Sequence, residues 1–233
     1  MSLASALPLT AVKHLVRYLP LLLLLPYGAT WGDECERLPK PSVSVNLLEE
    51  AVTLNTQHGH KELAHLGSAL VPKPGRLVLG LTRGNAVVQF SSTTPTYIEP
   101  TGQWECASPQ LTLTVGFRPM TVYVGREFPT GSCAYNEIHQ HELRHVKTYQ
   151  THLAKIKQDL GDTLNQRFAT GGAWRGPQGQ TRARLQRELD ERWLPYVQRE
   201  LRRVDTDQEL IDTPQEYERI ANSCNGEIRK RTF

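Results

Sequence analysis

The stretch between residues 138 and 164 reads IHQHELRHVKTYQTHLAKIKQDLGDTL. Apolar and histidine side chains recur in it three or four residues apart, at Ile138, His141, His145, Tyr149, His152, Ile156, Leu160 and Leu164. This spacing is typical of one face of an α-helix. The sequence therefore predicts a long helix, which the glycine-rich residues 169–177 then break.

A second helical pattern follows the break and is formed by Leu185, Leu189, Trp193, Tyr196, Val197, Leu201 and Val204. Pro195 within it predicts a kink. We expect the two helices to form an antiparallel hairpin that reverses near Ala173, with one more short helix around residues 214–222.

The chain before the long helix has the pattern of short strands. Apolar and polar side chains alternate at residues 42–45, 76–81, 110–115 and 121–124, with turn-forming residues between the runs. Such alternation predicts antiparallel strands with one face toward solvent, and one helix near residues 61–70 interrupts them. The expected fold is α+β in a single domain at residues 33–233: a β-rich part at 41–126, then a helical part at 133–233.

The first 32 residues have the parts of a secretory signal peptide. Lys13 and Arg17 precede an apolar run at residues 19–26, and small residues follow it. The run is shorter than the roughly 20 residues that span a bilayer. We expect cleavage between Ala29 and Asp33, a periplasmic or secreted protein, and no membrane span in the mature chain. A buried strand or an uncleaved anchor is the alternative.

Charge and cysteine content agree with export. Without the two basic residues of the leader the net charge is close to zero, and this disfavours nucleic acid as a partner. The four cysteines, Cys35, Cys106, Cys133 and Cys224, all follow the leader, and their even number predicts two disulfides of open connectivity. They form no C-x-x-C pair, so a cysteine zinc site is disfavoured.

The long helix contains the motif H-E-x-x-H at residues 141–145. Residues four apart lie above one another on a helix, so the imidazoles of His141 and His145 can bind one Zn²⁺ ion. Glu142 lies beside that position, where it can serve as the catalytic base toward a water molecule activated by the metal. The motif also occurs by chance, and the alternative is a pair of surface histidines on a charged helix.

The sequence offers several candidates for the third zinc ligand. His152 lies about 10 Å further along the helix axis than His145, too far to share the ion. Glu137 lies one helical turn before His141 and is better suited to accept a hydrogen bond from the N–H of a metal-binding imidazole than to bind the metal itself. If the hairpin reverses near Ala173, Glu200 lies opposite His145 on the apolar stripe of the second helix. A carboxylate there is costly unless it is paired or binds a metal, so we predict Glu200 as the third ligand. Glu188, Glu191, Glu216 and Glu218 remain alternatives.

Two other groups have simpler explanations. His58, His60 and His65 could bind a metal, but an exposed loop explains them better. Trp104, Trp174 and Trp193 could line a cleft, although aromatic side chains at such positions usually lie in the core.

Residues 43–146 resemble a family of bacterial secreted zinc-dependent proteases that is defined as a domain of unknown function. The matching residues are Gly80-Leu81-Thr82, Trp104-Glu105-Cys106, Ser132-Cys133, Glu137 and the motif at 141–146. The resemblance implies a zincin-like metallopeptidase fold with His141, His145 and Glu142 in the roles given above. The chain departs from the family near its end, where residues 222–226 read NSCNG and lack the family's histidine.

The sequence therefore predicts an exported zinc-dependent hydrolase, a peptidase or amidase, whose substrate is a peptide, a protein or a cell-wall peptide. A non-catalytic zincin-like module for binding or assembly in the cell envelope is the first alternative. The second is a disulfide-bonded envelope protein in which the motif is coincidental.

Overall fold

The computed structural model describes residues 33–68 and 77–232. The expected signal peptide, residues 1–32, lies outside them. The described residues all belong to one compact unit. Within the described ranges, no helix is both long and apolar enough to cross a membrane.

The larger sheet is built around the long strand β6 (Gln110–Val124). Strand β3 (Gly80–Thr93) pairs antiparallel with β6 along one side. On the other side, β1 (Ser42–Leu48) and β2 (Thr53–Asn55) pair with β6 in parallel. The antiparallel prediction is therefore correct for β3, of which only residues 80–81 were predicted as strand, and wrong for β1. Side-chain alternation carries no information on strand direction. Strand β2 was not predicted.

A smaller antiparallel sheet consists of β4 (Thr96–Ile98), β5 (Trp104–Ala107) and β7 (Trp174–Pro177). Strand β7 comes from the stretch that the sequence indicated only as a helix break. A short 3-10 helix, η1 (Glu34–Arg37), is joined to β5 by the disulfide Cys35–Cys106.

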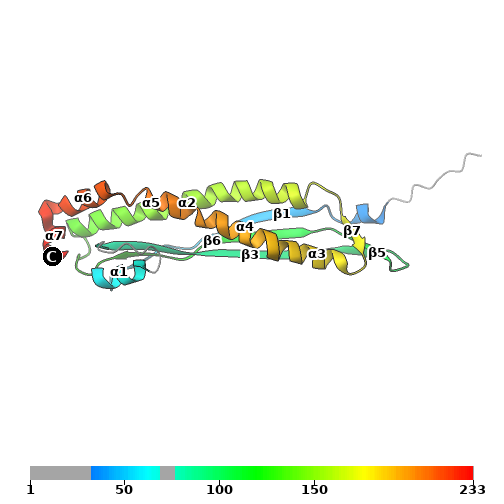
Figure 1. Ribbon diagram of the computed structural model, residues 1–233, viewed down its shortest axis with the longest axis horizontal. Helices are drawn as coiled ribbons and strands as arrows, with labels where there is room; N and C mark the ends of the chain where they lie inside the picture. Colours follow the sequence, from blue (N-terminus) through cyan, green and yellow to red (C-terminus); the bar gives the residue numbers. More distant parts are fainter. Residues whose placement is uncertain (1–32, 69–76, 233) are drawn as a thin grey trace, which may run out of the picture. The chain divides into compact units, whose positions relative to one another are not determined.

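The predicted long helix is α2 (Cys133–Phe168). The hydroxyl of Ser132 accepts a hydrogen bond from the backbone N–H of Tyr135 and so caps its first turn. Helix α2 and the returning helix α4 (Leu194–Arg202) lie on the same side of the larger sheet (Figure 1).

The second arm of the hairpin consists of α3 (Gln180–Glu188), the π-helical turn η2 (Leu189–Trp193), α4 and α5 (Val204–Glu209). The kink expected at Pro195 takes the form of this π-helical turn directly before α4. The arms run antiparallel, since Arg167 binds Glu188 at 2.6 Å and Nε2 of His152 lies 3.0 Å from the carbonyl of Glu200.

The main core lies between the sheet and these helices. Alternate residues of β6 are buried, and they pack against α2 and α4. The buried side chains include Leu111, Leu113, Val115, Phe117, Ile156, Leu160, Leu164, Val197 and Leu201. Each contributes about 1.5–3 kcal/mol of burial free energy, so α2 is held firmly against the sheet.

The C-terminal helices form a second, smaller core beside the start of α2. Helix α6 (Pro214–Asn222) is the short helix expected there, and η3 (Cys224–Gly226) and α7 (Glu227–Thr232) follow it. Ile220 and Ile228 pack against Phe128 and Ile138. The disulfide Cys133–Cys224 ties this segment to α2.

The predicted pair of disulfides is confirmed, and none of the four cysteines is free. Two disulfides indicate an oxidising environment outside the cytosol.

Candidate metal centre

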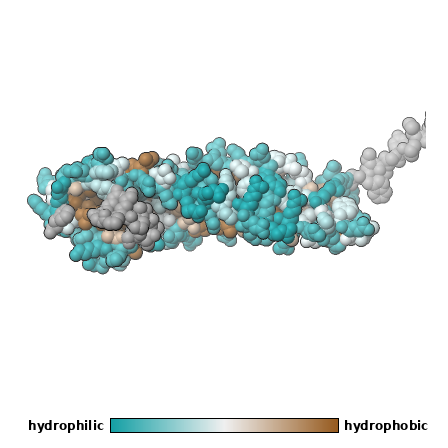
Figure 2. Space-filling view, viewed as in Figure 1, coloured by the Kyte–Doolittle hydropathy of each residue, from teal (hydrophilic) through white to brown (hydrophobic). Residues whose placement is uncertain are grey.

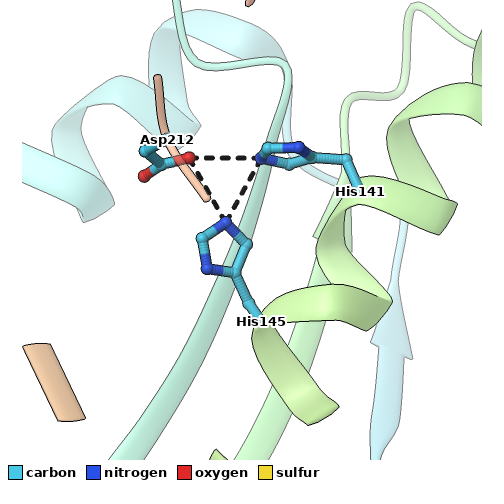
Figure 3. Close-up of side chains that lie close together, drawn as sticks. All are labelled: His141, His145 and Asp212. Atoms are coloured by element: carbon cyan, nitrogen blue, oxygen red, sulfur yellow. Dashed lines mark hydrogen bonds and ion pairs between the residues drawn. The ribbon is translucent and has the colours of Figure 1, made fainter. Parts of the chain in front are cut away.

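His141 and His145 of α2 converge with Asp212, which lies between α5 and α6 (Figure 3). Oδ1 of Asp212 is 3.2 Å from Nε2 of His141 and 3.3 Å from Nε2 of His145. The two Nε2 atoms are 3.2 Å apart. The three atoms thus form a nearly equilateral triangle, and this group could hold a metal ion.

The size of this triangle fits zinc. Zinc binds imidazole nitrogen and carboxylate oxygen at about 2.0–2.2 Å in tetrahedral geometry, which separates neighbouring ligand atoms by about 3.3 Å. The three observed separations lie close to that value. Two imidazoles and one carboxylate also match the ligand types of catalytic zinc sites, which leave the fourth position open.

Gln208 of α5 orients His145. Its Oε1 lies 2.6 Å from Nδ1 of His145, and its Nε2 donates to the carbonyl of the same histidine at 3.2 Å. The second bond fixes the amide orientation, so Nδ1 must carry the proton and donate it to Oε1. Nε2 of His145 then faces Asp212, and it is the atom through which this histidine would bind a metal ion.

Glu216 of α6 lies on the outer side of His141, with Oε1 3.4 Å from Nδ1. Arg219 and Arg144 also bind this carboxylate, and these bonds lower the pKa of Glu216 to about 2. Glu137, which the sequence suggested for this place, instead accepts a bond from Arg219 at 2.7 Å. Nη2 of Arg144 lies closer still to Nδ1 of His141, at 2.9 Å, so the ion pair of Arg144 and Glu216 stands behind this imidazole.

Asp212 is held in its charged form. Burial alone would raise the pKa of its carboxyl, but hydrogen bonds with His141 and His145 hold it well below its usual range. An ionised carboxylate is the form that binds a metal.

Glu142 is only 3% exposed. The hydroxyl of Thr82 on β3 lies 2.8 Å from its Oε2 and 3.0 Å from its backbone carbonyl. Burial raises the pKa of this carboxyl, and a metal cation nearby would oppose that rise. Room for the side chain comes from Gly80, where a Cβ would lie 2.6 Å from Oε1 of Glu142.

The three metal-binding candidates and Glu142 line a cleft of about 940 Å³. One part of the lining is Leu79 and the start of β3 at residues 80–82, together with Lys61 and His65 of α1 (His60–Ser68). Another part consists of Glu209, Asp212 and Tyr217. The site is thus open to a molecule of peptide size.

Glu200, the predicted third ligand, lies elsewhere. Its carboxylate pairs with Arg203 at 2.8 Å, and Asp212 takes its place beside the histidines. The cause is the position of the hairpin turn. Because β7 extends the connection, the chain reverses later than at Ala173. Gln208, about two helical turns beyond Glu200, therefore lies opposite His145.

The remaining candidates serve other contacts. Glu188 binds Arg167, Glu218 binds Arg229, and Glu191 is exposed. His60 binds Glu127 at 3.0 Å, and His58 lies 3.6 Å from Glu62. Trp174 and Trp193 pack against Phe168, and Trp104 lies near Tyr97.

Asp212, Gln208 and Thr82 are the residues that the sequence did not assign to the site. Thr82 was already among the residues of the family resemblance, which is the only signal that pointed to it. Compared with protein-family models, curated proteins and solved structures, the chain matches none.

Proposed function

We propose that this protein is an exported zinc-dependent hydrolase that cleaves peptide or amide bonds. The observation that supports the proposal most directly is the triangle of Nε2, Nε2 and Oδ1 atoms, with separations suited to tetrahedral zinc, in the wall of a cleft. The resemblance to secreted zinc-dependent proteases and a zincin-like architecture are parts of the same proposal.

A bound zinc ion would supply Lewis acidity, which polarises a carbonyl group and acidifies water at neutral pH. In this proposal His141, His145 and Asp212 hold the ion. Glu142 accepts a proton from a water molecule in the cleft and passes it to the leaving amine. Thr82 keeps the Glu142 carboxylate in place for both transfers by its hydrogen bond to Oε2.

The edge of β3 gives the substrate a place to bind. Of the described strands, only β6 pairs with β3, so the other edge of β3 has backbone groups available along the cleft wall. An extended peptide could add to this edge as a further strand. Main-chain recognition of this kind suits peptides, free or in the cell wall.

The assignment of the third ligand can be tested by zinc content. We expect Asp212→Ala to lose zinc far more readily than the wild type. Loss of a residue that only hydrogen-bonds to a metal ligand typically weakens metal binding about 10–100-fold. Loss of a ligand itself should weaken zinc binding by more than this. Glu200→Ala is the matched control and should retain zinc like the wild type. Elemental analysis after dialysis against a graded chelator measures both, and equal retention in the two variants would reject Asp212.

The role of Glu142 needs a separate comparison. Glu142→Gln should retain zinc and the thermal midpoint, because glutamine has nearly the same shape. It should lose about 10²–10⁴-fold in turnover of a peptide library, the usual contribution of a general base. Unchanged turnover would reject the mechanism. Zinc binding without any turnover in the wild type would favour a non-catalytic binding module.

A further inference from the structure

The outer surface of the returning helices carries seven exposed arginines. They are Arg182, Arg184, Arg187, Arg192, Arg199, Arg202 and Arg203. We call this surface the arginine face. No lysine occurs between Gln180 and Arg203, and the surface over α3 and α4 is strongly hydrophilic in Figure 2.

Acidic side chains of α3, η2 and α4 only partly offset this charge. Glu188 is bound by Arg167, which belongs to α2 rather than to the arginine face. Glu200 pairs with Arg203. Asp190 and Glu191 are the other two acids between residues 180 and 203. With seven arginines against four acids, the arginine face is positive from α3 to the end of α4, whereas α5, which follows it directly, adds Asp205, Asp207 and Glu209.

Three of these guanidinium groups lie over aromatic rings. The Cζ atom of Arg184 is 4.9 Å from the ring centre of Trp174. The corresponding distances are 5.3 Å for Arg192 over Trp193 and 5.4 Å for Arg199 over Tyr196. Such contacts restrict the arginine side chain and leave its N–H groups available for a ligand. The arginine face is thus partly organised before any partner binds.

The shape of the surface indicates the kind of partner. Helices α3, η2 and α4 follow one another without a gap, so the arginines, from Arg182 to Arg203, extend over about 32 Å at about 1.5 Å per residue. The opposite flank of these helices is buried in the core by Leu185, Val197 and Leu201. A long ridge with spaced guanidinium groups matches an array of phosphates better than one small anion. Arginine binds phosphate oxygens in a bidentate manner.

We propose that the arginine face docks the protein on an anionic lipid membrane through the phosphates of the headgroups. The proposal is independent of the proposed hydrolase activity. The two disulfides favour lipid over nucleic acid as the partner, because they indicate an environment outside the cytosol. In that environment, phospholipid headgroups are the abundant carriers of closely spaced phosphates.

The experiment is co-sedimentation of the disulfide-bonded protein with vesicles of phosphatidylcholine, with or without phosphatidylglycerol. The test variant is Arg182→Gln/Arg187→Gln/Arg202→Gln. The matched control is Lys147→Gln/Lys155→Gln/Lys157→Gln, which removes the same charge from exposed positions of α2. Circular dichroism verifies that both variants fold.

We expect the wild type to bind only the vesicles that contain phosphatidylglycerol. The arginine variant should lose binding at least about tenfold, while the lysine variant binds nearly like the wild type. Salt at about 0.5 M should release the protein, since exposed charges are screened. Equal losses in both variants would overturn the proposal. Release of the protein from the vesicles by millimolar inorganic phosphate would also overturn it. Binding of single-stranded DNA that depends on the arginines, without binding to vesicles, would do the same.

Discussion

At Gly80 the backbone of β3 passes so close to α2 that a side chain would enter the candidate site. A Cβ there would lie 2.6 Å from Oε1 of Glu142 and 2.7 Å from Cγ2 of Ile138. We expect Gly80→Ala to displace the Glu142 carboxylate, abolish hydrolysis and destabilise the fold by about 1–3 kcal/mol. Zinc should remain bound, because the two histidines and Asp212 are not touched.

Gly161 provides the control for this substitution. It lies within α2, and beyond the helix's own backbone a Cβ there would have no atom of the described residues within 4 Å. Gly161→Ala should therefore raise stability by about 1 kcal/mol through helix propensity. Urea unfolding, zinc content and turnover should be measured for both variants. Full activity in Gly80→Ala would show that the position of Glu142 is not critical.

The residues of the site differ in how far the sequence reveals them. His141, Glu142 and His145 follow from spacing on one helix, which is a local property. Asp212 and Gln208 reach the site only through the antiparallel return of the chain, so their position depends on where that return takes place. A small change in the turning point moves the opposing residue by twice as much, and this explains the choice of Glu200.

Among the elements, α3 depends on a residue from another part of the chain. Glu105 of β5 is 4% exposed, and its carboxylate accepts hydrogen bonds from the backbone N–H groups of Gly179 and Thr181, both at 2.8 Å. The hydroxyl of Thr181 donates to the same carboxylate at 2.5 Å. Glu105 therefore caps the N-terminus of α3, where a negative charge is favourable.

We expect Glu105→Gln to destabilise the protein at pH 7 by about 1–3 kcal/mol. Burial by itself would raise the pKa of Glu105, but the hydrogen bonds to Thr181 and Gly179 lower it below 4.5. A lowered pKa in the folded state stabilises the fold above the unfolded pKa, and this contribution is lost as the pH falls through the folded value. The difference between wild type and variant should therefore shrink near pH 3.

Urea unfolding at the two pH values measures this effect. Glu36→Gln is the control because Glu36 is exposed, and it should change stability little at either pH. A pH-independent difference for Glu105→Gln would mean that the amide loses packing rather than a charge at the helix end.

The elements themselves could be predicted to different degrees. The long helix, its return and α6 follow from apolar spacing. The direction of β1 does not follow from the sequence, since parallel and antiparallel strands can show the same alternation. Strand β2 has only three residues and was not predicted. Strand β7 was missed because Trp174 and Arg175 lie in a stretch rich in glycine and proline, and only pairing with β5 makes it a strand.

Across the whole molecule, the two disulfides join very different places. Cys133–Cys224 ties the start of α2 to the segment that carries Asp212 and Glu216, and Cys35–Cys106 joins η1 to β5. Each spans a long stretch of chain, with sequence separations of 91 and 71 residues. In the chain-entropy view each contributes about 4 kcal/mol.

We expect Cys133→Ser/Cys224→Ser to lower both stability and zinc affinity, because the segment with the third ligand is no longer tied to the histidines. Cys35→Ser/Cys106→Ser should lower stability by a similar amount and retain zinc. Thermal unfolding and a zinc-competition titration distinguish the two pairs. Equal zinc affinity in both variants would show that packing of Ile220 and Ile228 alone holds the segment in place.

The return of the chain at β7 also sets an order of events during biosynthesis. His141 and His145 leave the ribosome before Asp212, and Gln208 emerges between them. A nascent chain that ends within α3 therefore carries two of the three proposed ligands, and no hydrolytic centre can be complete. Chains that stop before Asp212 would thus lack the complete site, whatever the state of their long helix.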